Sequence, residues 1–173
     1  VMEAMWTRYL PQADIIRRLL ADGALGQVNV VGADFGFVAP YDPEGRMWNR
    51  ELGGGALLDA GVYPISFASS VLGAPTSIAA KGVLTSTGVD ATAALLLQHA
   101  DGAIAQLTTS MVTSVPTTAT IMGSAGRLDV LSPFFGPTGV ELRTGSLGSE
   151  QKVSWRDERF DVLHDGMADE ITA

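Results

Sequence analysis

The sequence predicts a single α+β domain, because helical patterns and strand patterns occupy different parts of the chain. Two stretches with helical spacing fall within the first 72 residues. From residue 76 onward, short apolar stretches are separated by Gly, Asp or Pro, which is the spacing of antiparallel strands joined by short turns. The chain has 173 residues, of which 46% are hydrophobic, so it is long enough for one packed core and too short for two ordinary domains.

The beginning of the chain predicts strand, helix and strand in turn. Residues 1–6 read as a strand entered midway. Residues 11–21 place apolar side chains on one side and two arginines on the other, at helical spacing. Gly23 and Gly26 end this helix and turn the chain. Residues 27–37 are rich in Val and aromatic residues and predict a strand.

A loop and a second helix follow. Residues 38–52 carry two prolines and mixed charges, so we expect a loop long enough to cover or line a site. A helix is expected over residues 55–72, ended by Gly73 and Pro75. Residues 160–173 return to a helical pattern without a stop signal. We therefore expect both ends to be cuts through a larger protein or the limits of its ordered part.

The rest of the chain predicts an antiparallel meander of short strands. Residues 99–102 have the composition of a hairpin turn. The expected strands cover residues 77–87, 91–99, 103–111, 117–122, 127–130, 140–143 and 151–155.

Composition excludes several classes of protein. The net charge of −8 repels nucleic acid, and the longest basic run is Arg17-Arg18. The absence of cysteine excludes a disulfide framework and suits a cytoplasmic protein. Glycine, aspartate or proline interrupts each apolar stretch before about 18 residues, so we expect no membrane span.

One part of the predicted sheet lacks charge altogether. Between Gly102 and Gly126 there is no charged residue. If one face of these strands packs on the helices, the other carries neutral side chains, namely Ile104, Gln106, Thr108 and Ser110. Such a face favours association between subunits, although a further part of the same protein could cover it instead.

Three consecutive glycines, residues 53–55, precede the second predicted helix. Free N–H groups at a helix start can bind an anion or oxyanion, and glycines there can equally mark a close backbone approach. A dinucleotide-binding loop would need G-x-G-x-x-G after a strand, and these glycines follow a polar loop.

Asp59 and Tyr63 are four residues apart on the same predicted helix, so their side chains share one face. A carboxylate can orient a substrate hydroxyl while a phenol transfers its proton, provided that a cation lowers the phenol pKa from about 10. Gly61, between them, leaves the helix surface open on the turn they share. Pro64 perturbs the hydrogen-bond ladder of that turn. The alternative is that Asp59 makes a local hydrogen bond and Tyr63 packs at the rim.

Two aromatic–cation pairs are weaker candidates for binding a polyol or an acid. Trp6 and Arg8 form one pair, and Arg46 and Trp48 on the loop form the other. Each pair could instead be ordinary packing or a surface contact.

The two histidines do not suggest a site. His99 lies in the expected hairpin turn and His164 on the last helix, and both are expected to be solvated. No metal-ligand spacing and no Ser/His/Asp arrangement is present in the sequence.

Two strings carry a resemblance to a known family. MEAMWTRYLP, residues 2–11, and GGGALLDAGVYPI, residues 53–65, resemble the Gfo/Idh/MocA oxidoreductases, with the dihydrodiol dehydrogenase and sugar oxidoreductase branch the most similar. Shorter strings at residues 88–90, 101–102 and 123–127 fit the C-terminal domain of that family.

The resemblance implies a C-terminal α+β domain with a large, open, mostly antiparallel sheet, helices packed on one face, and homodimers formed through the sheet. It implies an N-terminal Rossmann domain, absent from this chain, that binds NAD or NADP. It also implies that Tyr63 carries the proton, that Asp59 orients the substrate, and that a Lys upstream of Val1 completes the site. Trp6, Arg8, Arg46 and Trp48 are the expected substrate-binding residues.

The expected function is therefore the substrate side of an NAD(P)-dependent oxidoreductase acting on a sugar, polyol or diol. On this view the full-length parent is the enzyme, and the fragment alone is inactive. Two alternatives remain, a non-catalytic sugar-binding or dimerisation module of the same fold, and an unrelated α+β structural domain.

Overall fold

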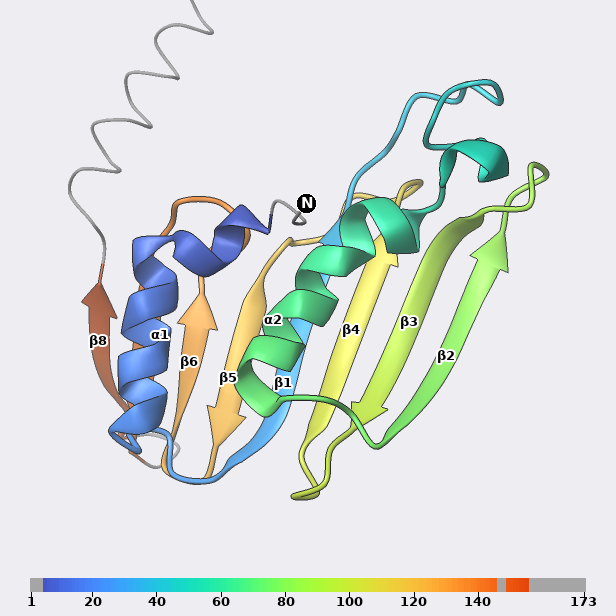
Figure 1. The fold of residues 1–173 in the computed structure, drawn as a ribbon. Helices are drawn as coiled ribbons and strands as arrows, with labels where there is room; N and C mark the ends of the chain where they lie inside the picture. Colours follow the sequence, from blue (N-terminus) through green and yellow to red (C-terminus); the bar gives the residue numbers. More distant parts are fainter. Residues whose placement is uncertain (1–4, 146–148, 156–173) are drawn as a thin grey trace, which may run out of the picture.

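In the computed structural model, residues 5–145 and 149–155 are described, and they form one eight-stranded sheet with helices on one face (Figure 1). The strand order is β2-β3-β4-β1-β5-β6-β7-β8. This arrangement confirms the expected α+β class with a large open sheet. The strands are β1 (Val28–Gly36), β2 (Ser77–Leu84), β3 (Asp90–Gln98), β4 (Ile104–Ser110), β5 (Ala119–Gly123), β6 (Gly126–Val130), β7 (Val140–Thr144) and β8 (Gln151–Trp155).

Strand β1 lies in the middle of the sheet, between β4 and β5. It pairs in parallel with β4 and antiparallel with β5, whereas the other neighbouring strands are all antiparallel. The expected uninterrupted meander is therefore wrong at one point, because β4 and β5 do not pair with each other. Buried Val31 and Ala33 on β1 account for its central place, since they add apolar surface to the core.

The helices lie over one face of the sheet, with one exception. They are the 3₁₀-helix η1 (Trp6–Tyr9), α1 (Pro11–Ala21), the 3₁₀-helix η2 (Arg50–Leu52), the π-helix η3 (Leu57–Gly61) and α2 (Val62–Leu72). The exception is η2, which belongs to the loop beyond the end of the sheet (Figure 1). The expected strand over residues 1–6 is wrong where it can be checked, because Trp6 begins η1, and residues 1–4 lie outside the described part. The helix expected at residues 160–173 also lies outside it.

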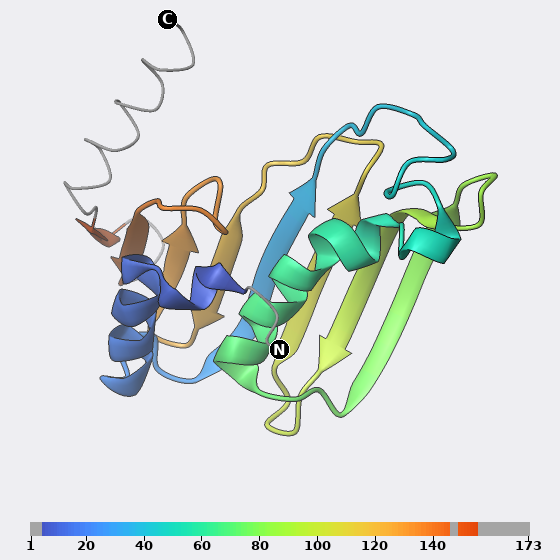
Figure 2. The same cartoon turned by 45° about the horizontal axis from the view of Figure 1, so that its top comes forward.

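The core fills the space between the helices and the sheet. Alternate side chains of each inner strand face the helices, and the fully buried ones include Val31, Leu107, Ile121 and Leu128. Figure 2 shows that the helices leave the opposite face of the sheet uncovered, and that the loop after β1 lies beyond the end of the sheet at which η3 begins.

Among the described residues, one helical stretch, Arg50–Leu72, is long and apolar enough by length and composition to cross a membrane, with a mean hydropathy of 1.3. As expected, glycines, Asp59 and Pro64 interrupt its apolar residues, although the stretch as a whole has this length and composition. In the fold the segment contains a 3₁₀-helix, a π-helix and an α-helix. The π-helix η3 and the α-helix α2 pack against β1 and β4. Pro64 and Ala68 of α2 are buried there.

His99 is buried, not solvated as expected, with a relative exposure of 3%. It lies in the hairpin turn, where its N–H donates to the Ala103 carbonyl at 2.9 Å. Both ring nitrogens lack a hydrogen-bond partner among the described residues. The expectation was wrong because hairpin composition does not reveal which side of the turn faces the core.

We predict that Ile121→Ala destabilises the protein far more than Ile78→Ala. Ile121 on central β5 is 0% exposed, whereas Ile78 on edge strand β2 is 64% exposed. The buried truncation leaves a cavity, so we expect a loss of about 2–5 kcal/mol in the free energy of unfolding, against less than about 1 kcal/mol for the exposed one. Urea denaturation measures both values, and equal losses would contradict the placement of the core.

Candidate functional site

The glycine run before η3 is held by the loop that precedes it. The N–H of Gly53 donates to the Arg50 carbonyl at 3.1 Å, that of Gly54 to Asn49 at 3.0 Å, and that of Gly55 to Met47 at 2.9 Å. All three donors are therefore occupied by backbone, and the interpretation of the run as an anion site is wrong.

Close approach explains these glycines instead. A Cβ on Gly54 would lie 2.6 Å from the Met47 carbonyl oxygen. Gly55 has a φ of +116°, and a Cβ there would overlap the Asp90 carboxylate. Asp90 Oδ2 accepts the Leu57 N–H at 2.7 Å, so a side chain from β3 takes one of the free donors at the helix start.

The first turn of the helix is a π-turn, and Pro64 gives a reason for it. Proline has no N–H to donate to the carbonyl four residues earlier, and its ring crowds that carbonyl. The turn over Leu57–Gly61 is therefore wider than an α-helical turn. Thr109 on β4 fixes the start of this turn to the sheet, because its hydroxyl donates to the Ala56 carbonyl at 3.1 Å.

Asp59 lies in the middle of this π-turn and is ion-paired with Arg46 of the loop. The Asp59 side chain is only 22% exposed, whereas the Arg46 side chain is 59% exposed. The structure thus brings together two residues that the sequence placed in separate candidate groups. The pair ties the loop to the helix and fixes the direction of the carboxylate.

Tyr63 is half-buried within a group of aromatic rings. Its ring meets Phe35 of β1 edge-on at a centroid distance of 5.5 Å and lies 5.3 Å from Phe135. Phe35 and Phe135 also contact each other at 4.4 Å. Within the described residues, no hydrogen bond of the Tyr63 hydroxyl is found. The phenol therefore has an apolar surround and an unused donor.

Asp59 and Tyr63 share the start of the helix but do not bind each other. No hydrogen bond joins their side chains in the described structure, and Asp59 bonds to the loop while Tyr63 packs on β1 and Phe135. The widened turn accounts for this, because a spacing of four residues stacks side chains on an α-helix and not on a π-helix.

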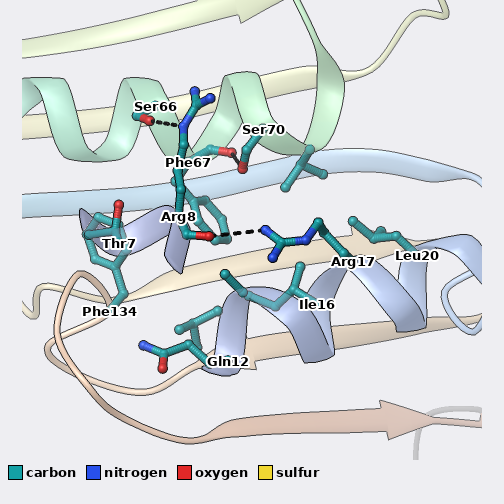
Figure 3. Close-up of a pocket in the computed structure, with 13 residues that line it drawn as sticks. Thr7, Arg8, Gln12, Ile16, Arg17, Leu20, Ser66, Phe67, Ser70 and Phe134 are labelled. Atoms are coloured by element: carbon teal, nitrogen blue, oxygen red, sulfur yellow. Dashed lines mark hydrogen bonds between the residues drawn. The ribbon is translucent and has the colours of Figure 1, made fainter. Parts of the chain in front are cut away.

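Arg8 lies across the groove between α1 and α2 (Figure 3). Its Nε donates to the Ser66 hydroxyl at 3.2 Å, one turn beyond Tyr63 on α2. The groove encloses about 270 Å³, and neither Asp59 nor Tyr63 lines it. Trp6, two residues before Arg8 on η1, is exposed and remains a candidate contact surface for a substrate.

Trp48 is part of the packed interior of the loop. It is 7% exposed, its indole N–H donates to the Pro40 carbonyl at 2.8 Å, and Tyr41 meets its ring edge-on. Ala39, Ala56, Val89 and Met111 complete this small core. Trp48 therefore has a packing role, which was the alternative for this residue, and its ring is not available to a substrate.

Two features of the site had no signal in the sequence. Phe135 lies 72 residues after Tyr63, and Asp90 lies 31 residues after Asp59. Neither belongs to a local sequence pattern.

A metal centre is not indicated, because no group of three or more His, Cys, Asp or Glu residues among the described residues could hold an ion.

The family model of the GFO/IDH/MocA C-terminal domain matches residues 14–129 of this chain. The chain belongs to this family. The resemblance to this family is thereby confirmed, and residues 53–65, which carry part of it, lie within the matched range.

Curated relatives of this family member include dihydrodiol dehydrogenases. The trans-1,2-dihydrobenzene-1,2-diol dehydrogenase of Xenopus tropicalis is 35% identical over 166 residues, which is 95% of this chain and 46% of that protein. The human enzyme of the same name is 38% identical over 140 residues, or 80% of this chain and 41% of that protein. The chain thus spans less than half the length of these relatives.

Solved structures with the same fold include sugar-modifying oxidoreductases. The aldose-aldose oxidoreductase from Caulobacter crescentus, complexed with glycerol, has a TM-score of 0.74 and 25% identity, covering 87% of this chain and 46% of its own. A variant of a 3-ketoreductase from Actinomadura kijaniata, in complex with TDP-benzene and NADP, has a TM-score of 0.76 and 26% identity, covering 90% of this chain and 49% of its own.

We predict that Gly55→Ala destabilises this domain more than Gly53→Ala. Both glycines have positive φ, but a Cβ on Gly53 meets nothing within 4 Å, whereas one on Gly55 overlaps Asp90. We expect a cost of about 1–2 kcal/mol at Gly53 from backbone strain alone. At Gly55 the same strain adds to a steric clash, giving about 3 kcal/mol or more. Thermal unfolding with both variants checks the difference, and an equal cost would contradict the close approach.

Proposed function

We propose that this chain is the substrate-side domain of an NAD(P)-dependent oxidoreductase that moves a hydride between a nicotinamide and a carbinol or carbonyl carbon of a sugar, polyol or diol. The observation that carries the proposal is the Tyr63 phenol at the start of a helix tethered to the sheet. Phe35 and Phe135 pack on its ring, and its hydroxyl has no partner among the described residues. The oxidoreductase names of the relatives support the same reaction class.

Tyr63 is the proposed proton carrier. Its hydroxyl gives a proton to the substrate oxygen during carbonyl reduction, and its phenolate takes one during alcohol oxidation. Phe35 and Phe135 shield one side of the phenol from water, which favours a defined position for the proton. A bound nicotinamide would supply the hydride for carbonyl reduction and accept it in alcohol oxidation.

Asp59 is the proposed orienting residue for a substrate hydroxyl. Its pairing with Arg46 leaves a carboxylate whose direction is fixed and whose charge is already balanced. A hydrogen bond from a substrate hydroxyl to this carboxylate would place the reacting carbon relative to Tyr63. Arg46 then acts through Asp59. Arg8 and Trp6, on the same side of the sheet, are secondary candidates for binding the substrate.

The residues described here do not fit the pyrophosphate of a dinucleotide. The glycine run is the nearest candidate cradle, and its three N–H groups already donate to loop carbonyls. We therefore assign cofactor binding, and the cation beside the phenol, to an N-terminal domain outside this chain. The residues of that domain select NAD or NADP.

We also propose a cytoplasmic location, in keeping with the absence of cysteine.

The apolar rings beside Tyr63 favour a substrate with a flat or weakly polar face. Phe35, Phe135 and the exposed Trp6 offer such surfaces, while Asp59 offers the polar contact. A cyclic diol or a sugar presents both kinds of surface on one molecule. This combination supports the substrate class without selecting one member.

We predict that Tyr63→Phe in the full-length protein lowers kcat by about 100-fold or more, because general acid–base catalysis by one side chain contributes about that much. Binding of the nicotinamide, followed by fluorescence, is expected to stay within about threefold. Tyr41→Phe is the matched control, because Tyr41 is exposed on the loop and packs only its ring against Trp48. Turnover of Tyr63→Phe close to that of the control would exclude Tyr63 as the proton carrier.

We further propose that the helix-free face of the sheet joins two copies of the protein. Leu96 of β3 and Ile104 of β4 are exposed on this face, and Gln106 between them is neutral. Thr108 is half-buried, and Ser110, expected on the same face, is buried with its hydroxyl 2.8 Å from that of Thr92. An exposed apolar area of this kind favours association.

Charges border this neutral area on the side of β6, β7 and β8. Asp129 accepts from the Nε atoms of Arg127 at 3.1 Å and Arg143 at 3.2 Å. The Lys152 ammonium, 2.6 Å from Glu141, hydrogen-bonds that carboxylate and with Arg143 lowers the Glu141 pKa below its ordinary value. The charges are paired with one another, so this part of the face carries little net repulsion between copies.

We predict that the protein sediments as a dimer or larger at micromolar concentration, and that Leu96→Glu shifts it to monomer. A buried, unpaired carboxylate opposes the contact between the two faces. Tyr9→Glu is the control, because Tyr9 is exposed on η1 on the helical side of the sheet. A wild-type monomer, or a dimer insensitive to Leu96→Glu, would show that the sheet face is not the interface.

A further inference from the structure

We propose that Asp90 is a positioning residue for the reaction, because it fixes the helix start from which Asp59 and Tyr63 project. The inference rests on the proposed function of these two residues. Asp90 acts through the backbone, and no contact between its side chain and a substrate is required.

The contact that carries the inference joins two distant parts of the chain. Asp90 is the first residue of β3, and its Oδ2 accepts the Leu57 N–H at 2.7 Å across 33 residues. Its other oxygen lies against Gly55, where only a hydrogen leaves room for it. The carboxylate therefore fills a fixed space and holds a fixed donor at the same time.

The position of Leu57 makes this contact relevant to the chemistry. Leu57 is the first residue of the π-turn, Asp59 follows within that turn, and Tyr63 follows at the start of α2. A movement of Leu57 relative to the sheet would displace both side chains, whereas Phe35, which packs on Tyr63, belongs to the sheet itself. Such a displacement would separate the phenol from its aromatic surround.

Thr109 supplies the second tether. Its hydroxyl holds the Ala56 carbonyl at 3.1 Å, and its methyl group lies 3.2 Å from the position that a Cβ on Gly61 would take. Asp90 and Thr109 belong to neighbouring strands, β3 and β4. One of them holds a helix donor and the other holds a carbonyl, so the start of the helix is fixed in two directions.

The charge of Asp90 also suits its place. A carboxylate near the first turn of a helix interacts favourably with the free N–H groups there. A hydrogen bond to an ionised acceptor is stronger than one between neutral groups. Asparagine at the same place keeps an acceptor oxygen of similar shape and loses the charge, which separates the two contributions.

The test compares Asp90→Ala, Asp90→Asn and Asp101→Ala in the full-length protein, at temperatures where circular dichroism shows all of them folded. Asp101 is the matched control, because its Oδ1 also accepts a backbone N–H, that of Ala103 at 3.1 Å, in the hairpin beyond the other end of β3. For Asp90→Ala we expect kcat to fall about 10- to 100-fold, the range for a misplaced catalytic group, with KM for substrate and nicotinamide within about threefold. Asp90→Asn should recover kcat to within about threefold of wild type, and Asp101→Ala should leave it unchanged.

Three outcomes overturn the inference. The first is a kcat for Asp90→Ala equal to that of Asp101→Ala. The second is a loss in KM alone, which would give Asp90 a binding role, and the third is no recovery in Asp90→Asn. Tyr63→Phe measured in parallel separates this result from a failure of the proposed function: if that variant keeps its turnover, the proposed function fails and the positioning role fails with it.

A second variant keeps the inference testable if Asp90→Ala does not fold. Thr109→Val removes the hydroxyl that holds Ala56 and keeps the shape of the side chain. We expect its kcat to fall by about 10-fold with KM unchanged, and Thr109→Ser to recover it. A folded Thr109→Val with wild-type kcat would overturn the idea that tethering of the helix start controls the reaction.

Discussion

The hydrogen bond from the Leu57 N–H to the Asp90 carboxylate joins the start of a helix to the start of a strand, at 2.7 Å. Glycine at position 55 is needed so that the carboxylate can approach, and the hydroxyl of Thr109 holds the preceding carbonyl. These contacts, made from β3 and β4, determine where Asp59 and Tyr63 lie relative to the sheet. The candidate chemistry thus depends on a small tethered region more than on the length of the helix that follows it.

The two faces of the one sheet carry different side chains. The helical face carries the core, the aromatic rings around Tyr63 and the loop that holds Asp59 through Arg46. The opposite face has no helices among the described residues, and it combines exposed Leu96 with ion pairs on β6 and β7, such as that between Asp129 and Arg143. Because strand side chains alternate between faces, the same short strands supply the side chains of both faces.

The sequence predicted what local patterns encode. Spacing predicted α1 and all eight strands near their true positions, and the strings around residues 2–11 and 53–65 indicated the family. It did not predict the insertion of β1 between β4 and β5, because pairing partners far apart in the chain leave no periodic signal. The π-turn, the burial of Trp48 and His99, and the approach of Asp90 and Phe135 depend on tertiary contacts in the same way. The pairing of Asp59 with Tyr63 was inferred from α-helical spacing, and the wider turn altered it.

The central claim is that the Tyr63 hydroxyl meets the reacting oxygen of the substrate. A crystal structure of the full-length protein with a reduced nicotinamide and a bound diol or sugar tests this most directly. The account predicts the Tyr63 hydroxyl within about 2.6–3.2 Å of the carbinol oxygen, with an Asp59 oxygen bonded to a neighbouring substrate hydroxyl. A substrate bound in the groove beside Arg8, with its reacting oxygen away from Tyr63, would contradict it.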